Sequence, residues 1–230
     1  AQLVRVAVRM LDNVLDVTYW PLPEQRREAQ AKRRIGLGFL GLGSALVMLG
    51  IRYDSAQGVA FGAQVAQALR DEAYRASVDL AGEKGAFPAL DAERYLQSGF
   101  ARRLPDDIRS AVAERGIRNS HLLSIAPTGT ISLSLANNAS NGIEPSFAHH
   151  YFRNVIRQGK KSKEKVDVFS FELLAYRALV NPRAMPDSTK PGEKLPDYFV
   201  ASDDITPREH VDIQAASQKW IDSSISHMRT

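Results

Sequence analysis

The chain has 230 residues, 44% hydrophobic and 24% charged, which is ordinary for a globular protein with one substantial core or two small ones. It has no cysteine, which excludes disulfides and cysteine metal sites, and no apolar run reaches the roughly 18 residues that cross a bilayer. The net charge of +4 would suit a phosphorylated ligand but is too diffuse to indicate nucleic-acid binding. Nothing resembles a signal peptide, so we expect a cytoplasmic protein that contacts neither nucleic acid nor membrane.

The first predicted element is a helix over residues 2–18, where apolar residues recur at helical spacing. Asp12 and Asp16 lie one turn apart on it, and we expect them to face solvent or form salt bridges rather than act as a carboxylate pair. Residues 19–23 end this helix, and the charged stretch 24–34 predicts a second, solvent-exposed helix. Because the chain begins without Met inside an apolar-periodic stretch, we expect it to be a fragment of a longer polypeptide.

Three glycines after the second helix, Gly36, Gly38 and Gly41, match the G-x-G-x-x-G spacing of a dinucleotide-binding turn. We reject that function because the turn requires a hydrophobic strand before it, and residues 31–34 are Ala-Lys-Arg-Arg. The seven-residue spacing of Gly36, Gly43 and Gly50 predicts instead a buried helix whose glycine side lets another backbone approach. Gly50 is expected to end that helix.

Helices dominate the rest of the chain and are separated by short extended segments. We expect helices at 56–81 (capped by Asp54 or Ser55), 91–94, 105–116, 169–179, and from the capping box Thr206–Glu209 to about residue 221. Short strands are expected at 122–126, 152–156, 198–201 and 223–226, with an exposed loop at 181–195. This pattern predicts an α/β unit with a parallel sheet.

Two polar clusters could suggest a metal site and a nucleic-acid surface, and we predict neither. His149 and His150 are adjacent, and on a strand they would point to opposite faces, so we do not expect them to share a metal ion. The basic stretch 160–165 contains no aromatic residue, and we expect a solvated loop rather than a nucleic-acid surface.

The most informative stretch runs from Ser120 to Pro145, where a short apolar run breaks at Pro127 into Thr128-Gly129-Thr130. We expect a buried strand, a tight hydroxyl-rich turn, and a new helix or extended segment. Gly129 would let the backbone approach a ligand, hydroxyls at 128, 130 and 132 would donate hydrogen bonds, and free N–H groups at a helix start attract phosphate. The alternative is an ordinary strand-to-helix connection capped by threonine.

The sequence Pro127-Thr128-Gly129-Thr130-Ile131-Ser132, followed by Asn141–Pro145, resembles the substrate-phosphate loop of the ribonucleotide reductase large chain, most closely that of the adenosylcobalamin-dependent, class II branch. Further segments resemble the same family in the same order, so the resemblance covers essentially the whole chain: Asp12–Asp16, Arg33–Gly38, Leu195–Phe199 and Asp222–Ser226. It implies a ten-stranded α/β barrel, of which residues 1–230 would be a single helix-rich fragment with a few short parallel strands, truncated at both ends. One departure is His227-Met228 after Ser226, where relatives usually carry Lys-Thr.

The resemblance implies that the full-length protein is a vitamin B12-dependent ribonucleoside-diphosphate reductase, which converts ribonucleotides to 2′-deoxyribonucleotides by thiyl-radical chemistry. In this family the radical forms on a cysteine, so the cysteine-free chain would hold no catalytic residue, and we expect no metal site in it. Its part would be substrate-phosphate binding by Pro127, Thr128, Gly129, Thr130, Ile131 and Ser132. For the full-length enzyme the resemblance implies adenosylcobalamin as cofactor, a ribonucleotide substrate, a thioredoxin-type reductant and a homodimer. The alternatives are a cysteine-free nucleotide-binding module without catalysis and a fragment of a class I reductase large chain.

Overall fold

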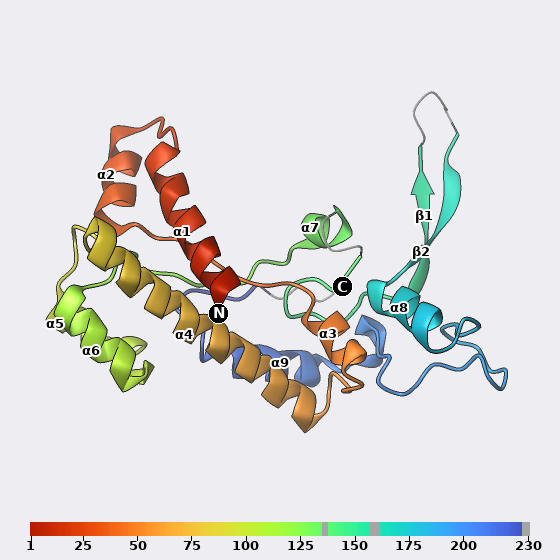
Figure 1. Ribbon diagram of the computed structural model, residues 1–230. Coiled ribbons are helices and arrows are strands. Elements are labelled where there is room, and N and C mark those ends of the chain that lie inside the picture. Colours follow the sequence, from red (N-terminus) through yellow and green to blue (C-terminus); the bar gives the residue numbers. More distant parts are fainter. Residues whose placement is uncertain (135–137, 157–161, 227–230) are drawn as a thin grey trace. The chain divides into compact units, whose positions relative to one another are not determined.

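The structure is a computed structural model that describes residues 1–134, 138–156 and 162–226. Helices dominate these residues (Figure 1): α1 (Gln2–Val17), α2 (Pro23–Lys32), α3 (Leu42–Met48), α4 (Ala56–Lys84), α5 (Ala92–Leu96), α6 (Asp106–Arg115), α7 (Gly129–Ser134), α8 (Phe171–Leu179) and α9 (Pro207–Gln218). Short 3₁₀ turns occur at Ala101–Arg103 and Ser202–Asp204, and the strands β1 (His150–Val155) and β2 (Glu164–Phe169) form an antiparallel hairpin. Among the described residues, no helix is both long and apolar enough to cross a membrane.

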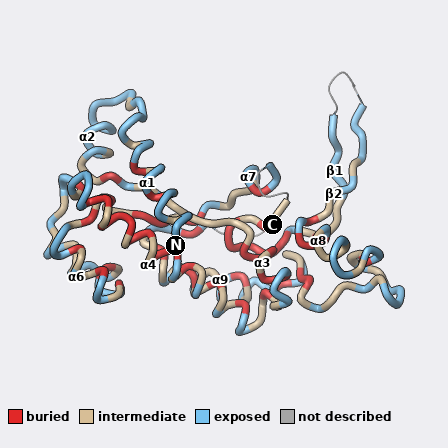
Figure 2. The backbone as a smooth tube through the Cα atoms, in the orientation of Figure 1, coloured by how far each residue is buried: buried red, intermediate tan, exposed pale blue. Residues whose placement is uncertain are grey.

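The chain folds as two compact units. Unit 1 comprises Ala1–Gly38, Ala63–Ile125 and Ser217–Ile225, and unit 2 comprises Phe39–Gly62 and Ala126–Ala216. Figure 2 shows where burial is concentrated: α2 has no buried residue and β1 is exposed over most of its length, whereas α4 presents a nearly continuous buried side.

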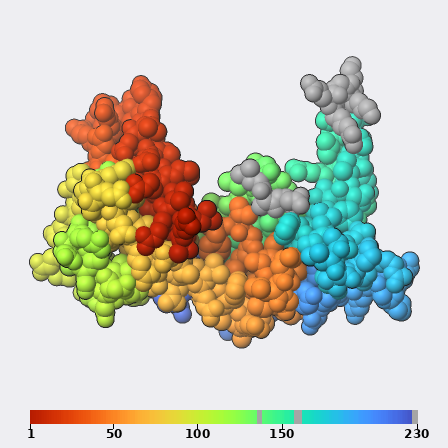
Figure 3. Space-filling view, viewed as in Figure 1, coloured from red at the N-terminus to blue at the C-terminus, as the bar shows by residue number. Residues whose placement is uncertain are grey.

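In unit 1, ion pairs join α1 to α4, and Figure 3 shows the two helices in contact. Arg5 donates to Asp79 and Arg9 donates to Glu83, each at 2.7 Å. The predicted helix over 2–18 is confirmed, but its buried side is the one that carries Asp12. Five of the apolar residues that give the helical spacing are exposed: Leu3, Val6, Met10, Val14 and Val17. The side of this helix that is buried therefore carries Val8 and Asp12, and the ion pairs to α4 lie at its exposed margin.

The centre of unit 1 consists of three extended segments that pair in parallel, at the bridges Leu37–Leu123 and Ile125–Ile225. The helix expected around residues 35–49 is therefore wrong in its first half, because tertiary pairing overrides the glycine spacing. The expected close approach of a second backbone does occur, but between extended segments. A Cβ on Gly38 would lie 2.4 Å from the carbonyl oxygen of Ser124.

The carboxylate of Asp222 joins the segment before Ile225 to the segment that contains Leu123, beyond the single bridge between them. The carboxylate oxygens of Asp222 accept hydrogen bonds from the N–H of Leu122 at 2.7 Å and of Leu123 at 3.0 Å. The Tyr74 hydroxyl donates to the same carboxylate at 2.9 Å. Of the strand expected at 223–226, the structure shows a single bridge at Ile225, and the departure noted at residues 227 and 228 lies outside the described residues.

The other predicted helices are confirmed, with ends shifted by a few residues. Ser55 caps α4 by accepting a hydrogen bond from the N–H of Gly58 at 3.0 Å. Thr206 and Glu209 form the expected capping box at the start of α9. Gly50, with a φ of 68°, follows the short helix α3 and stops it as expected.

In unit 2, the strand expected at 152–156 is confirmed as β1, which pairs antiparallel with β2 from His150–Phe169 to Val155–Glu164. This corrects the expected parallel sheet: among the described residues, parallel pairing is limited to single bridges, including Ser146–Ala201. At 198–201, where a strand was expected, the structure shows only the bridge at Ala201.

Part of the basic stretch 160–165 belongs to β2 instead of a loop, whereas residues 160 and 161 lie outside the described residues.

The apolar side of α8 closes the core of unit 2. Leu173 of α8 packs with Val47 of α3 and Phe199, and partly buried residues surround this cluster: Phe169, Tyr176, Leu195 and Tyr198. Ser170 caps α8 by accepting from the N–H of Leu173 at 3.3 Å. The loop expected at 181–195 is confirmed, because no helix or strand lies between α8 and the 3₁₀ turn Ser202–Asp204.

Candidate functional site

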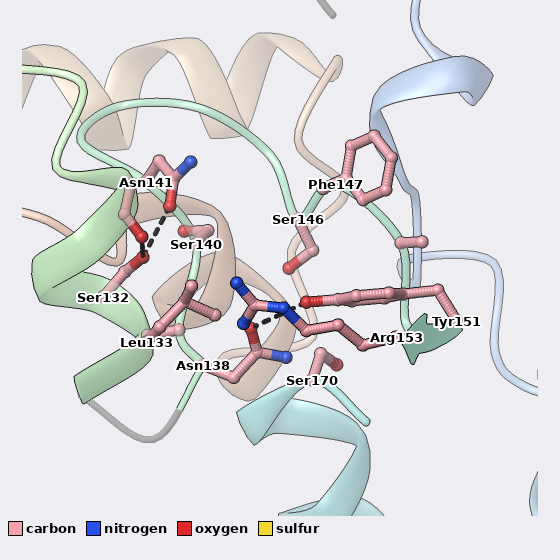
Figure 4. Close-up of a pocket in the computed structure, with 13 residues that line it drawn as sticks. Ser132, Leu133, Asn138, Ser140, Asn141, Ser146, Phe147, Tyr151, Arg153 and Ser170 are labelled. Carbon is pink, nitrogen blue, oxygen red and sulfur yellow. Dashed lines mark hydrogen bonds between the residues drawn. The ribbon is translucent and has the colours of Figure 1, made fainter. Parts of the chain in front are cut away.

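A pocket of about 300 Å³ lies in unit 2, where α7, the turn at 138–141, the loop at 146–148 and β1 face one another (Figure 4). Its lining is rich in hydroxyl and amide groups and includes Arg153 from β1. The described residues that line the pocket are Gly129, Ser132, Leu133, Asn138, Ala139, Ser140, Asn141, Ser146, Phe147, Ala148, Tyr151, Arg153 and Ser170. None of these residues is Asp or Glu. The arrangement favours a small polar ligand that carries negative charge.

One wall of the pocket begins with a sharp turn at Thr128. This residue has a φ of 54°, in the left-handed region, which reverses the chain directly after Pro127. The Thr128 carbonyl accepts from the N–H of Ser132 at 2.9 Å and closes the first turn of α7, while its Oγ1 accepts from the N–H of Gly142 at 2.9 Å. This second bond ties together the two sequence motifs at 127–132 and 141–145.

Ser132 forms a second link between the same segments. Its Oγ donates to Oδ1 of Asn141 at 2.7 Å, and both side chains line the pocket (Figure 4). The amides of Gly129, Thr130 and Ile131 belong to the first turn of α7, so the helix itself offers them no acceptor. A Cβ on Gly129 would meet nothing closer than Nδ2 of Asn141 at 3.9 Å, so the backbone there is open on its pocket side.

The structure divides the six expected phosphate-binding residues into two groups. Gly129 and Ser132 line the pocket, whereas the other four do not: Pro127, Thr128, Thr130 and Ile131. Thr128 and Pro127 shape the turn, and Ile131 is 47% exposed. Thr130 and Ile131 could therefore bind an anion at the helix start through their backbone N–H groups but not through their side chains.

Behind the pocket lies a buried carboxylate that sequence analysis did not single out. Glu172 is fully buried, and its carboxylate accepts from Ser44 Oγ at 2.7 Å and from Ser146 Oγ. His149 Nδ1 lies 3.2 Å from Glu172 Oε1. Burial raises the pKa of Glu172, but the hydrogen bonds from His149, Ser146 and Ser44 outweigh burial and lower the pKa below its ordinary value.

This carboxylate organises the pocket wall. Ser146 lines the pocket directly, and Ser44 and Ser140 exchange hydrogen bonds between N–H and Oγ at 3.1 Å and 2.9 Å. Ser140 also lines the pocket. Glu172 therefore positions two lining serines without contacting the cavity itself.

The two adjacent histidines take different environments, although only His150 belongs to β1 and His149 precedes it. His149 is buried and its Nε2 lies 3.2 Å from the carbonyl oxygen of Val200. His150 pairs with Asp167 at 2.7 Å and stacks on Phe169. Among the described residues, no group of three or more His, Asp or Glu side chains is arranged to hold a metal ion.

Sequence analysis missed the part of the pocket contributed by β1. The signal was present, because alternation along a strand places Tyr151 and Arg153 on one side and His150 and Phe152 on the other. The expected strand began at 152, and the hairpin partner β2 was not predicted. Without the partner strand, the sequence offered no reason to bring Arg153 next to Gly129.

Comparison with known proteins identifies the group to which the chain is related. Residues 1–228 match the family model described as ribonucleotide reductase, barrel domain. The chain belongs to this family. The resemblance drawn from the motif at 127–132 is thereby confirmed at the level of the family, as is a helix-rich α/β fold.

Several ribonucleotide reductases are similar to the chain over nearly its whole length. It is 35% identical over 227 residues to a vitamin B12-dependent ribonucleoside-diphosphate reductase of Mycobacterium tuberculosis (strain ATCC 25618 / H37Rv), covering 96% of the chain and 30% of that relative. A protein of the same name from Thermoplasma acidophilum is 30% identical over 232 residues, covering 97% of the chain and 28% of the relative. The ribonucleoside-diphosphate reductase subunit alpha of Chlamydia trachomatis is 28% identical over 254 residues, covering 96% of the chain and 24% of that subunit. The chain thus spans less than a third of the length of these relatives.

Proposed function

We propose that this chain is the substrate-phosphate-binding segment of a ribonucleotide reductase that converts ribonucleotides to 2′-deoxyribonucleotides. In this proposal, residues 1–230 form part of a ten-stranded α/β barrel. The observation that carries the proposal is the turn at Thr128, which starts α7 beside a pocket lined by Gly129 and Ser132 and by no described carboxylate.

The proposed role of the loop is to bind and orient the substrate phosphates. The first-turn amides of Gly129, Thr130 and Ile131 would donate to phosphate oxygens, and the open side of Gly129 allows close approach. Pro127 and the bond from Gly142 to Thr128 hold the turn in place, and the bond from Ser132 to Asn141 fixes the adjoining pocket wall. Binding energy from the phosphates would fix the position of the ribose, where the reaction takes place.

The thiyl-radical chemistry of the proposal requires cysteines that this chain does not contain. The radical-bearing and reducing cysteines would therefore come from other parts of the protein, and the residues described here would bind substrate only. A thioredoxin-type reductant and a homodimeric enzyme complete the proposal, and both rest on the family resemblance.

We further propose the class II branch, with adenosylcobalamin as the cofactor. The support is that the relatives from M. tuberculosis and T. acidophilum, at 35% and 30% identity, are named vitamin B12-dependent, while the class-unspecified relative from C. trachomatis is 28% identical. Adenosylcobalamin generates the radical when bound. It does not fit the pocket at α7, because about 300 Å³ is the lower limit for drug-sized ligands and the cofactor is much larger. We therefore assign the pocket to substrate phosphate and derive no step through the cofactor.

The test uses Gly129→Ala in the natural protein, with CDP affinity as the first readout. The new Cβ would face Asn141 Nδ2 at an ordinary contact distance of 3.9 Å, so folding should be unaffected while phosphate approach is blocked. We expect CDP to bind at least about tenfold more weakly, a change of about 1.4 kcal/mol. Gly82→Ala, where a Cβ meets nothing within 4 Å, is the matched control and should bind CDP normally. Unchanged CDP affinity in Gly129→Ala would remove this loop from the substrate site.

Activity measurements separate the remaining alternatives. CDP reduction that requires added adenosylcobalamin would support class II, whereas reduction without it would indicate a class I large chain. Binding of CDP without any reduction under either condition would favour a nucleotide-binding module that performs no radical chemistry.

A further inference from the structure

The position of Arg153 follows from strand alternation on β1. Tyr151 and Arg153 lie on one side of the strand and both line the pocket, whereas the rings of His150 and Phe152 meet edge to face on the opposite side. Lys165 of β2 covers the ring of Phe152 at 3.7 Å and so also belongs to that opposite side. Of the hairpin's basic side chains that the structure describes, Arg153 is the one that lines the pocket, and Figure 4 shows it there beside Tyr151 and Asn138.

Arg153 makes no ion pair or hydrogen bond through its side chain with any residue that the structure describes. Its cross-strand partner is Val166 and that of Tyr151 is Val168, so no carboxylate stands opposite either residue. In unit 1, by contrast, Arg33 donates to the carboxylate of Asp12 at 2.8 Å. Since none of the described lining residues is acidic, Arg153 gives the pocket a net positive charge.

The groups around Arg153 are suited to phosphate oxygens. A guanidinium presents a planar fork of N–H donors that matches phosphate, and its charge persists at every physiological pH. The Tyr151 hydroxyl lies 3.5 Å from Asn138 Oδ1, a long contact that leaves this hydroxyl available to a ligand. Asn138 itself is anchored, because its Nδ2 donates to the carbonyl of Phe169 at 2.9 Å.

The pocket therefore has two sides that differ in chemistry. The α7 side offers backbone amides and neutral hydroxyls, and the β1 side offers a fixed positive charge. A diphosphate spans such a pocket naturally, with one phosphate on each side, and a volume of about 300 Å³ is more appropriate to a phosphate group than to a whole nucleotide.

We propose that Arg153 is a specificity-determining residue that recognises the terminal phosphate of the substrate across the pocket from the Gly129 turn. This proposal rests on the proposed function, which places substrate phosphate at the start of α7. It adds that the hairpin, and not only the loop, distinguishes a nucleotide from a nucleoside.

The experiment measures the affinity of the natural protein for CDP, CMP and cytidine in the Arg153→Gln and Arg153→Lys variants. Arg153→Gln should weaken CDP binding at least tenfold, change CMP binding less, and leave cytidine binding unaltered. It should also reduce the dependence of CDP affinity on salt concentration, because one charge–phosphate contact is lost. Arg153→Lys, which keeps the charge but not the fork, should recover part of the CDP affinity.

Arg208→Gln is the matched control, since it removes an equal charge from the same unit at a residue whose side chain is 90% exposed on α9. It should bind CDP like the unmodified protein. Normal CDP affinity in Arg153→Gln, or an equal loss of CDP and cytidine, would overturn the proposal.

The two proposals fail in distinguishable ways. If Gly129→Ala weakens CDP binding and Arg153→Gln does not, the loop binds substrate and the role of Arg153 is wrong. If neither variant affects CDP binding, or the unmodified protein does not prefer CDP to cytidine, the proposed function of this pocket is itself wrong.

Discussion

Each unit of the molecule holds a fully buried carboxylate, and the two carboxylates have different kinds of hydrogen-bonding partner. Asp12 in unit 1 is surrounded by cations: Arg33 at 2.8 Å, Lys84 at 3.2 Å and Arg118 at 3.3 Å. Glu172 in unit 2 is held by two serine hydroxyls and His149, with no arginine or lysine bonded to it among the described residues.

Both environments stabilise the ionised form. Burial raises the pKa of Asp12, but the hydrogen bond and charge of Arg33, followed by Arg118 and Lys84, outweigh it and lower the pKa. Burial also raises the pKa of Glu172, and there hydrogen bonds from His149, Ser146 and Ser44 outweigh it. Asp12 therefore joins distant segments by charge, whereas Glu172 orients neutral groups that line a pocket whose charge comes from Arg153.

The largest expected effect comes from removing the charge of Asp12. Asp12→Asn leaves the buried guanidinium of Arg33 without its main partner and places an N–H₂ group among donors, so we expect a loss of about 3–5 kcal/mol in the free energy of unfolding. Urea denaturation measures this loss. Asp16→Asn is the control, because Asp16 also pairs with Arg33 but is 47% exposed, and it should cost at most about 1 kcal/mol. Equal costs would contradict the central role of Asp12.

Glu172→Gln should have a smaller effect that is concentrated at the pocket. The amide keeps the shape but replaces one acceptor by a donor, so we expect a cost of about 1–3 kcal/mol. Hydrogen exchange in residues 140–149 should accelerate, because Ser140 and Ser146 lose their anchor. Asp212→Asn on the exposed side of α9 should leave that exchange unchanged. An unaltered exchange rate in Glu172→Gln would show that Glu172 does not hold the pocket wall.

Acid should weaken the protein through the same two carboxylates. Because their pKa values are lowered in the folded state, the unfolded chain takes up protons first as the pH falls. The stability that they contribute is complete above roughly pH 5, and it is lost as the pH falls through about 4 toward the lowered folded values. The free energy of unfolding, measured from pH 7 to pH 3, should fall less steeply in Asp12→Asn than in the unmodified protein. Identical slopes would contradict the assigned pKa shift.

Ser44→Ala gives the smallest expected effect and separates the two halves of the Glu172 network. It removes the bond to Glu172 and the one that Ser44 Oγ accepts from the N–H of Ser140, but it keeps the bond from the backbone N–H of residue 44 to Ser140 and leaves Ser146 and His149 in place. We expect a cost of about 1 kcal/mol. The measurement is again urea denaturation, with the exposed Ser110→Ala on α6 as the control. A cost as large as that of Glu172→Gln would mean that Ser44, rather than Ser146, carries the network.

Much of the local structure could be predicted from the sequence because its causes are local. The caps at Ser55 and Thr206, the stop at Gly50 and the turn after Pro127 each depend on a few neighbouring residues, and each occurs where it was expected. The motif at 127–132 also indicated the family and the segment that begins the pocket wall.

Pairing between distant segments could not be predicted in the same way. Residues 35–38 become extended because 121–125 lies beside them, and helical spacing of the glycines contains no information about that partner. The apolar spacing of α1 predicted a helix but did not show which of its sides is buried, and the structure buries the side with Val8 and Asp12.

Most helices, their caps and the position of the hydroxyl-rich turn could be predicted from the chain alone, because they follow from short-range backbone and side-chain preferences. The motif at 127–132 likewise indicated the family. Only the tertiary structure decided that Gly129, Ser132 and Arg153 line one pocket and that Glu172 supports its wall. The physical reason is that these contacts join residues far apart in the chain, so their stability depends on packing and on the antiparallel register of β1 with β2.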